Sequence, residues 1–136
     1  MGEPKLTLNL TTEPVKPTEV RITNHSSYAL KLNQKATIEC QAAGSKPEAR
    51  VRWFRGQTEL DAGELSRVEQ LSGAQFYISE FNRDNDNNLT KVSHLTFVPQ
   101  LSDHKQSLVC SASNPKMPNI SPISDSITMN VLCKFH

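Results

Sequence analysis

The sequence predicts an all-β fold, an antiparallel β-sandwich of seven to eight strands. Short runs of alternating apolar and polar residues recur along its 136 residues, and clusters of Gly, Pro and Asn separate them. No run shows a helical period of useful length. A chain of this length can form one domain with a real core and is too short for two.

The two ends are expected to lie outside this domain. Residues 1–16 hold a β-like run and a Pro-rich connector, which is typical of the tail of a preceding domain and its linker. Met1 and Gly2 are expected to derive from recombinant expression. The domain itself should span 17–132, and 133–136 should begin the connection to a following domain.

The strands of the first half are marked by alternation and by turn residues. In the strand expected at Ala36–Ala42, Ile38 and Cys40 point inward, and the turn from Gly44 to Pro47 follows. The next strand places Trp53 inward. In chain order the strands are expected at Val20–Thr23 with a second piece at Tyr28–Leu32, at Ala36–Ala42, at Ala49–Arg55 and in a short piece near Leu60.

The second half supplies the remaining strands. Residues 61–88 show the weakest pattern, and a single strand is expected within them. The later strands alternate clearly, and the last turns Ile127, Met129 and Val131 inward. These strands are expected at Phe76–Phe81, Leu89–Val98, Ser107–Ser113 and Ser124–Leu132.

Two cysteines and a tryptophan narrow the fold class to an immunoglobulin-like sandwich of the constant type. Cys40 and Cys110 each lie mid-strand on the inward parity, and Trp53 lies inward on the strand after Cys40. A disulfide that joins two sheets, with an indole packed on it, has this arrangement. We therefore predict a Cys40–Cys110 disulfide with Trp53 packed against it. The alternative is a pair of buried thiols, as in intracellular muscle-type immunoglobulin domains.

The third cysteine, Cys133, lies at the end of the last strand. An odd cysteine can pair between chains or stay a free thiol. We expect a free thiol, or one whose partner lies outside this chain. No metal site is expected with the nearby His136, because no further ligand stands at a suitable spacing.

Four Asn-x-Ser/Thr triplets indicate a protein of the secretory pathway. Each lies near a strand end or in a loop, where a glycan could project into water. Together with the cysteine pair they favour an oxidising, extracellular setting. The acceptor candidates are Asn9, Asn24, Asn88 and Asn119.

Several other function classes find no support in the residues. The 15 basic and 14 acidic side chains are scattered, so nucleic acid is not an expected partner. No run approaches the ~18 apolar residues of a membrane span, so direct membrane contact is not expected. The Asp- and Asn-rich run from Asp84 to Asn88 begins like a calcium-binding loop but lacks the later Gly and Glu of such a loop. We expect a solvated polar loop there. No nucleophile or phosphate-loop motif occurs, so we expect neither catalysis nor a cofactor.

Three stretches carry a family resemblance. Gly44–Ala49, Val51–Gly56 and Leu108–Pro115 resemble the second-position immunoglobulin domains of nephrin-like and Sidestep-like proteins. The similarity extends over about 17–132. One departure from antibody-type domains is Leu108, which stands where those domains have a corner tyrosine; this agrees with the nephrin-like subtype.

The resemblance implies a cell-surface role. It implies tandem domains on the extracellular side of the plasma membrane in a single-pass receptor for adhesion or axon guidance. The expected partners are immunoglobulin-family cell-surface or secreted proteins, Beaten-path-like for a Sidestep-like chain, and the neighbouring domains of the same chain.

Two roles within such a receptor remain open. One is direct protein recognition through outward residues of one sheet. The other is a spacer that positions a neighbouring recognition domain, and for this role we expect the domain by itself to be monomeric. The possible contact face consists of Arg50, Arg52, Phe54, Val109 and Asn130.

Overall fold

The computed structural model describes residues 13–23, 29–60, 76–85 and 88–133. Within them lie ten strands and one short 3-10 helix. In chain order these are β1 (Glu19–Ile22), β2 (Ala29–Lys31), β3 (Ala36–Ala43), β4 (Arg50–Arg55), β5 (Thr58–Leu60), β6 (Phe76–Asn85), β7 (Asn88–Phe97), η2 (Leu101–Asp103), β8 (Ser107–Ser113), β9 (Ile123–Thr128) and β10 (Asn130–Leu132).

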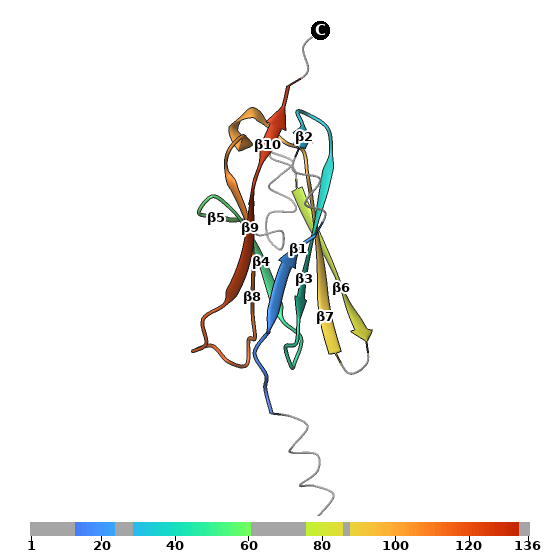
Figure 1. Cartoon of the computed structure of the whole chain (residues 1–136), viewed down its shortest axis with the longest axis vertical. Helices are drawn as coiled ribbons and strands as arrows, with labels where there is room; N and C mark the ends of the chain where they lie inside the picture. Colours follow the sequence, from blue (N-terminus) through green and yellow to red (C-terminus); the bar gives the residue numbers. More distant parts are fainter. Residues whose placement is uncertain (1–12, 24–28, 61–75, 86–87, 134–136) are drawn as a thin grey trace, which may run out of the picture.

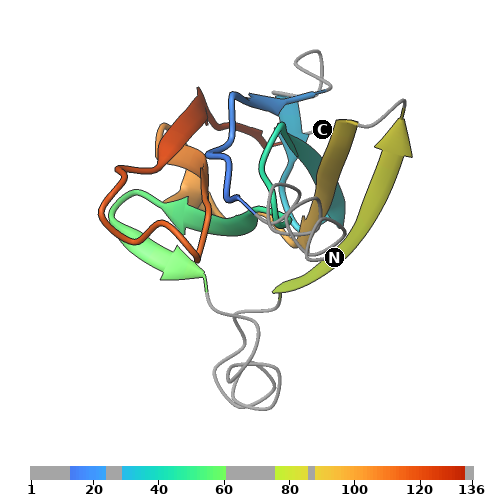
Figure 2. The ribbon, with the colours of Figure 1, turned by 90° about the horizontal axis from the view of Figure 1, so that it is seen from below.

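Two four-stranded antiparallel sheets face one another (Figures 1 and 2). One has the order β1-β3-β7-β6 and the other the order β5-β4-β8-β9. This is the constant-type immunoglobulin arrangement with β5 added at one edge. The predicted all-β sandwich is therefore confirmed. One pairing departs from the expected antiparallel pattern, because β10 runs parallel to β2.

The last predicted strand is interrupted. The sequence predicts one continuous strand from Ser124 to Leu132, but the structure divides it into β9 and β10 at Met129. The Met129 amide donates to the Gln106 carbonyl at 2.9 Å, and the Lys105 amide donates to the Met129 carbonyl at 2.7 Å. Both backbone groups of Met129 are thus hydrogen-bonded to the turn before β8. After Met129 the chain leaves β8 and pairs with β2.

Strand β6 is longer than the expected 76–81. It pairs with β7 over its whole length, from Phe76 opposite Phe97 to Asn85 opposite Asn88. Residues 61–75, which precede it, lie outside the described residues. The extension arises because β6 and β7 form one continuous hairpin ladder.

The core fills the space between the sheets. Alternate residues of β3 are buried, as its sequence pattern predicts. The apolar core is shared by both sheets, so the sandwich has a single main cluster. Its buried members are Ile22, Leu30, Ile38, Cys40, Trp53, Leu60, Leu95, Phe97, Leu108, Cys110, Ile127 and Met129.

The segment before β1 is attached to the domain at the pole where the chain enters (Figure 1). Val15 and Lys46 exchange two backbone hydrogen bonds of 2.8 and 2.9 Å. Asn114, which is 3% exposed, donates from Nδ2 to the carbonyls of both residues at 2.9 and 2.8 Å. Three separate loops are thereby fastened together.

Candidate protein-contact surfaces

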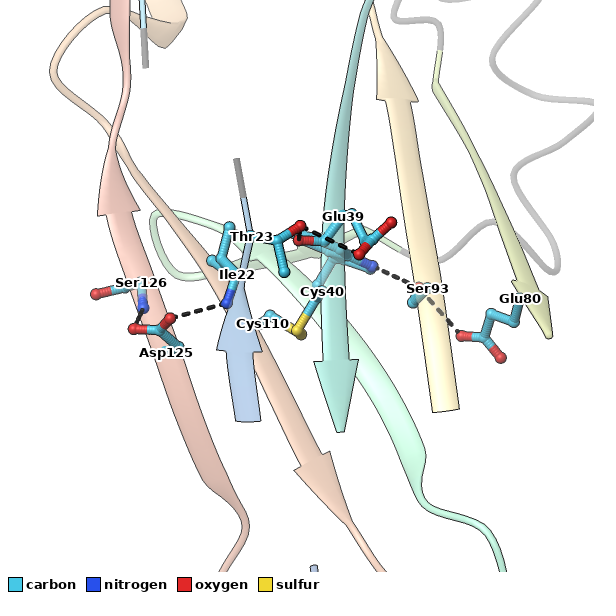
Figure 3. Close-up of a disulfide and its surroundings, with 10 residues drawn as sticks. Ile22, Thr23, Glu39, Cys40, Glu80, Ser93, Cys110, Asp125 and Ser126 are labelled. Carbon is cyan, nitrogen blue, oxygen red and sulfur yellow. Dashed lines mark hydrogen bonds between the residues drawn. A yellow bond between two sulfur atoms is a disulfide. The ribbon is translucent and has the colours of Figure 1, made fainter. Parts of the chain in front are cut away.

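The disulfide and the Trp53 indole connect the two sheets through the core. Cys40 of β3 is bonded to Cys110 of β8 (Figure 3). Trp53 lies directly opposite Cys110 on β4. Trp53 is fully buried, and its Nε1–H donates to the Ser93 hydroxyl at 2.8 Å. The predicted disulfide and the predicted burial of Trp53 are confirmed. The strands on which both candidate surfaces lie are therefore linked through the core.

A second link joins the sheets near the disulfide. The Ile22 amide of β1 donates to a carboxylate oxygen of Asp125 on β9 at 2.9 Å (Figure 3). Ser93 also donates to Glu80 of β6 at 3.4 Å. Polar side chains thus connect edge strands to the core without leaving a buried polar side chain unpaired in the described residues.

A cluster of charged side chains lies between the sheets at the entry pole. Lys91 is opposite Ala42, on the inward parity of β7, and its side chain is only 12% exposed. Its Nζ lies 2.8 Å from Glu48 and 3.8 Å from Glu80. Hydrogen bonds from Lys91 and Asn82, together with the positive charge of Lys91, lower the pKa of Glu48.

The first candidate surface is the outer face of β5-β4-β8-β9. Phe54 and Val109 are directly opposite each other on β4 and β8, and both are half-buried. Arg50 and Arg52 are exposed on the same outward parity of β4. Arg52 approaches Glu59 of β5 at 3.8 Å. The structure therefore brings together four of the five residues of the sequence-based contact face.

The fifth residue lies on a different ladder. Asn130 is exposed, but it belongs to β10 and is opposite Ala29 of β2. Grouping it with β4 and β8 assumed one unbroken last strand. Because the strand divides at Met129, Asn130 is not part of the four-stranded sheet that holds the other four residues.

The second candidate surface is the outer face of β1-β3-β7-β6, which is not among the surfaces predicted from the sequence. Tyr77 and Phe81 of β6 are 53% and 46% exposed, and they are the exposed aromatic side chains among the described residues. The His94 ring lies 5.9 Å from Phe81, and the Arg83 guanidinium lies 5.8 Å from the Phe81 ring centre. Aromatic and arginine side chains are the residues that most often anchor protein interfaces.

These residues face outward because of the ladder between β6 and β7. Ile78 is opposite the buried Leu95, so even-numbered residues of β6 face the core and odd-numbered ones face outward. Alternation within 76–85 is the signal that could have identified them. It is weak in the sequence, because the inward positions include Glu80 and Asn82.

A hydrogen-bonded pair, Glu39 and His94, lies at the middle of this second surface. His94 Nε2 is 2.8 Å from Glu39 Oε1, and Gln41 and Thr23 donate to Glu39 at 2.7 and 3.2 Å (Figure 3 labels Thr23 and Glu39). Burial raises the pKa of Glu39, but these hydrogen bonds and the His94 charge outweigh it. The net effect is a lowered pKa, so Glu39 stays ionised.

The other predicted residues occupy varied positions. Asn119 is exposed in the connection between β8 and β9, and Asn88 is the first residue of β7, whereas Asn9 and Asn24 lie outside the described residues.

Cys133 is a free thiol of intermediate exposure. Across the described ranges no three His, Cys, Asp or Glu side chains cluster as a metal site would require. Nor does that part of the chain contain a helix able to span a membrane.

Comparison with known proteins places the chain among immunoglobulin domains. The family model for CD80-like C2-set immunoglobulin domains matches residues 13–118. Cell adhesion molecule 3 of Homo sapiens is 34% identical over 105 residues, which cover 76% of this chain and 22% of that protein. Its Xenopus laevis counterpart is 38% identical over 53 residues, covering 39% of this chain and 14% of the relative. The chain thus spans less than a quarter of each relative.

Solved structures agree on the fold. Rst D1-D2 matches with a TM-score of 0.66 at 22% identity, covering 88% of this chain and 51% of the other. The mouse nectin-like molecule 4 ectodomain gives 0.60 at 17% identity, covering 88% and 35%. The complex of Dpr2 with DIP-Theta gives 0.54 at 17% identity, covering 88% and 33%. At these identities the similarity concerns the fold alone.

Proposed function

The chain belongs to the CD80-like C2-set immunoglobulin domain family, and from this membership we propose that it is an extracellular module of a cell-surface adhesion receptor. The module acts by non-covalent protein recognition within a longer ectodomain. The observation that carries this proposal is the 34% identity to human Cell adhesion molecule 3 over 105 residues. The Cys40–Cys110 disulfide supports it, since such bonds persist in oxidising compartments.

We assign recognition first to the outer face of β5-β4-β8-β9. Arg50, Arg52, Phe54 and Val109 form a connected patch on the paired strands β4 and β8, and the disulfide joins β8 to the opposite sheet. Arginines that flank a half-buried aromatic suit a protein interface, because the guanidinium can pair with carboxylates while the ring supplies apolar area. Asn130 is left out of this face because it lies on another ladder.

The finer setting rests on the resemblance found in the sequence. Gly44–Ala49, Val51–Gly56 and Leu108–Pro115 support a guidance receptor of the Sidestep-like or nephrin-like type. Such a receptor would be single-pass, with this domain outside the cell between neighbouring immunoglobulin domains. Its partner would be another immunoglobulin-family protein, Beaten-path-like if the chain is Sidestep-like.

A spacer role is the second candidate. The Asn114 hydrogen bonds support it, because they fasten the segment before β1 to two loops of the domain. A fastened entry would fix the direction of whatever precedes the domain. Phe54 and Val109 are also only partly exposed, which limits the apolar area that their face can offer.

Binding by the full ectodomain separates the two roles. The ectodomain would be measured against a panel of immunoglobulin-family ectodomains, with residues 17–132 deleted and with Arg52→Glu or Phe54→Ala. Direct recognition predicts loss of binding in all three variants. Lys116→Glu, a charge reversal in the exposed β8–β9 connection, is the matched control and should bind normally.

The outcomes point in different directions. If the deletion weakens binding while both point variants bind like the parent, the domain is a spacer. An ectodomain that reaches the cell surface but binds no immunoglobulin-family protein, including itself, contradicts the proposed function.

A further inference from the structure

The outer face of β1-β3-β7-β6 has a charge pattern that is complementary to itself. The strand registers arrange its outward residues in rows that run across the sheet from the β1 side to β6. From the entry pole upward the rows are Glu19-Ala43-Thr90-Arg83, then Arg21-Gln41-Val92-Phe81, then Glu39-His94-Ser79, then Thr37-Thr96-Tyr77.

The two rows nearest the entry pole change character from one edge of the sheet to the other. The first begins with the acidic Glu19 and ends with the basic Arg83, both exposed. The second begins with the exposed Arg21 and ends with the exposed ring of Phe81. A surface of this kind fits a second copy that is turned so that the two edges exchange places.

A two-fold axis parallel to the strands, between β3 and β7, makes this exchange. It places β1 of one copy over β6 of the other while keeping each row opposite itself. Glu19 then faces Arg83 of the second copy, and Arg21 faces Phe81 of the second copy, a cation over an aromatic ring. Near the axis Glu39 faces His94 of the second copy. An isologous interface requires this self-complementarity, in which residue i meets j and j meets i.

The relief of the face follows the same symmetry. Beside β1 lies a shallow hollow of about 190 Å³ lined by Glu19, Arg21, Gln41, Ala43 and Thr90. At the opposite edge the Phe81 ring is 46% exposed, whereas the neighbouring Val92 is fully buried. The two-fold that matches the charges also brings the exposed Phe81 ring of one copy to the hollow of the other.

On these grounds we propose that two copies of this domain associate through the outer face of β1-β3-β7-β6, with Glu19, Arg21, Phe81 and Arg83 as the contact residues. The association is separate from the partner face proposed on the other sheet and does not depend on it. The proposal also differs from the sequence-based expectation of a monomer. The sequence alone does not show which strands lie side by side, so this face could not be recognised from it.

The size of the face sets the strength of the association. Strands lie about 4.8 Å apart and rise about 3.4 Å per residue, so the four rows cover on the order of 400 Å². A standard interface buries about 800 Å² on each partner, so this pairing belongs to the weak, transient class.

Sedimentation equilibrium of this chain tests the proposal. From about 10 µM to about 1 mM, the mass average should rise reversibly from the monomer toward the dimer, and less so at high salt. Arg83→Glu and Glu19→Arg should each weaken association by about tenfold, because both symmetric pairs become repulsive. The double variant Glu19→Arg with Arg83→Glu should restore it, because each pair is again of opposite charge.

The double variant separates intermolecular pairing from structural damage. Within one copy Glu19 and Arg83 stand three strand spacings apart, about 14 Å, so they cannot form an ion pair with each other. Rescue can then come only from contact between copies. Phe81→Ala should weaken the dimer, whereas Phe54→Ala on the opposite face should leave it unchanged.

Two results would overturn the inference. One is a chain that stays monomeric at about 1 mM, which would leave this face to a different partner or to solvent. The other is a dimer that Phe54→Ala disrupts and Arg83→Glu does not, which would place the self-association on the opposite sheet.

Discussion

Trp53 connects the disulfide, the core and the hydrogen-bond network through one side chain. It is fully buried, and it bonds to Ser93 across the sandwich. Trp53→Ala should lower the free energy of unfolding by about 3–5 kcal/mol, because it removes a large ring and leaves a cavity. Trp53→Phe should cost less, since most of the ring volume remains.

Denaturant unfolding followed by circular dichroism measures both variants. In the parent, Trp53 is the one tryptophan of the chain, so its fluorescence should shift to longer wavelength on unfolding. A Trp53→Ala protein that unfolds at nearly the parent midpoint would contradict the position given to this residue.

Two carboxylates should give the domain an acid-sensitive stability. The pKa values of Glu39 and Glu48 are both lowered from the usual 4.5. A group whose folded pKa is depressed stabilises the fold above its unfolded pKa and loses that effect as pH falls through the folded pKa. The free energy of unfolding should therefore decline as pH falls below 4.5, and Glu39→Gln with Glu48→Gln should make the decline shallower.

Thermal unfolding across a series of pH values checks this dependence. The double Gln variant should differ from the parent most near neutral pH and converge with it in acid. Parallel curves for the two proteins, separated by a constant amount at every pH, would mean that neither carboxylate is linked to folding.

At the scale of elements, the disulfide ties β3 to β8 and encloses a loop with a sequence separation of 70. The chain-entropy model assigns such a loop roughly 4 kcal/mol of stabilisation. Unfolding without reductant and alkylating should modify only Cys133, whereas reduction first should modify all three cysteines. Intact mass gives the number of alkyl groups directly. Two or three groups on the unreduced protein would contradict the assigned pairing.

Asn114 should control how firmly the entry segment is held. It donates to the carbonyls of Val15 and Lys46, and its Oδ1 accepts from the Lys116 amide at 2.8 Å. Asn114→Ala should cost about 1–3 kcal/mol, because the three hydrogen bonds of this buried side chain are lost. Hydrogen exchange should quicken at the amides of Val15 and Lys46 and stay unchanged in β3.

Asn114→Asp is the matched variant, since it keeps the shape and Oδ1 but loses the Nδ2 donor. It should loosen the same two amides. Unchanged exchange at Val15 in both variants would show that the backbone pairing with Lys46 holds the segment without Asn114, and would remove this support for a spacer role.

Sequence patterns predicted the strands in which one side of the ladder is wholly apolar. Ile38, Cys40 and Ala42 alternate without exception, and β3 lies where they indicate. The pattern is weakest where polar residues face inward, as Glu80 and Asn82 do on β6, whose second half it did not predict. It also cannot show that Met129 leaves the ladder, because that depends on hydrogen bonds to Lys105 and Gln106.

The contact surfaces were less predictable than the strands. Outward parity on β4 and β8 is a local property, so Arg50, Arg52, Phe54 and Val109 could be grouped from the sequence alone. The opposite face depends on which strand lies beside which. Glu19 and Arg83 share a row only because β1, β3, β7 and β6 are neighbours in that order.

At the scale of the whole molecule, the sandwich has two outward faces, and Trp53 and the disulfide connect the two sheets that carry them. One face holds Arg50, Arg52, Phe54 and Val109, which we propose as the surface for a protein partner, and the other holds the rows that we propose contact a second copy. β1 begins at one pole and β10 ends at the other, so both faces lie along the side of the module (Figure 1). A receptor could therefore engage a partner and a neighbouring copy at once.

Cell aggregation tests the adhesion function most directly. Cells that do not adhere would display the whole protein and be mixed with one another and with cells displaying immunoglobulin-family ectodomains. We expect aggregates with at least one of these populations, lost when residues 17–132 are deleted although surface display is unchanged. Failure to aggregate with any population at full surface display, or aggregation that survives the deletion undiminished, would contradict the account.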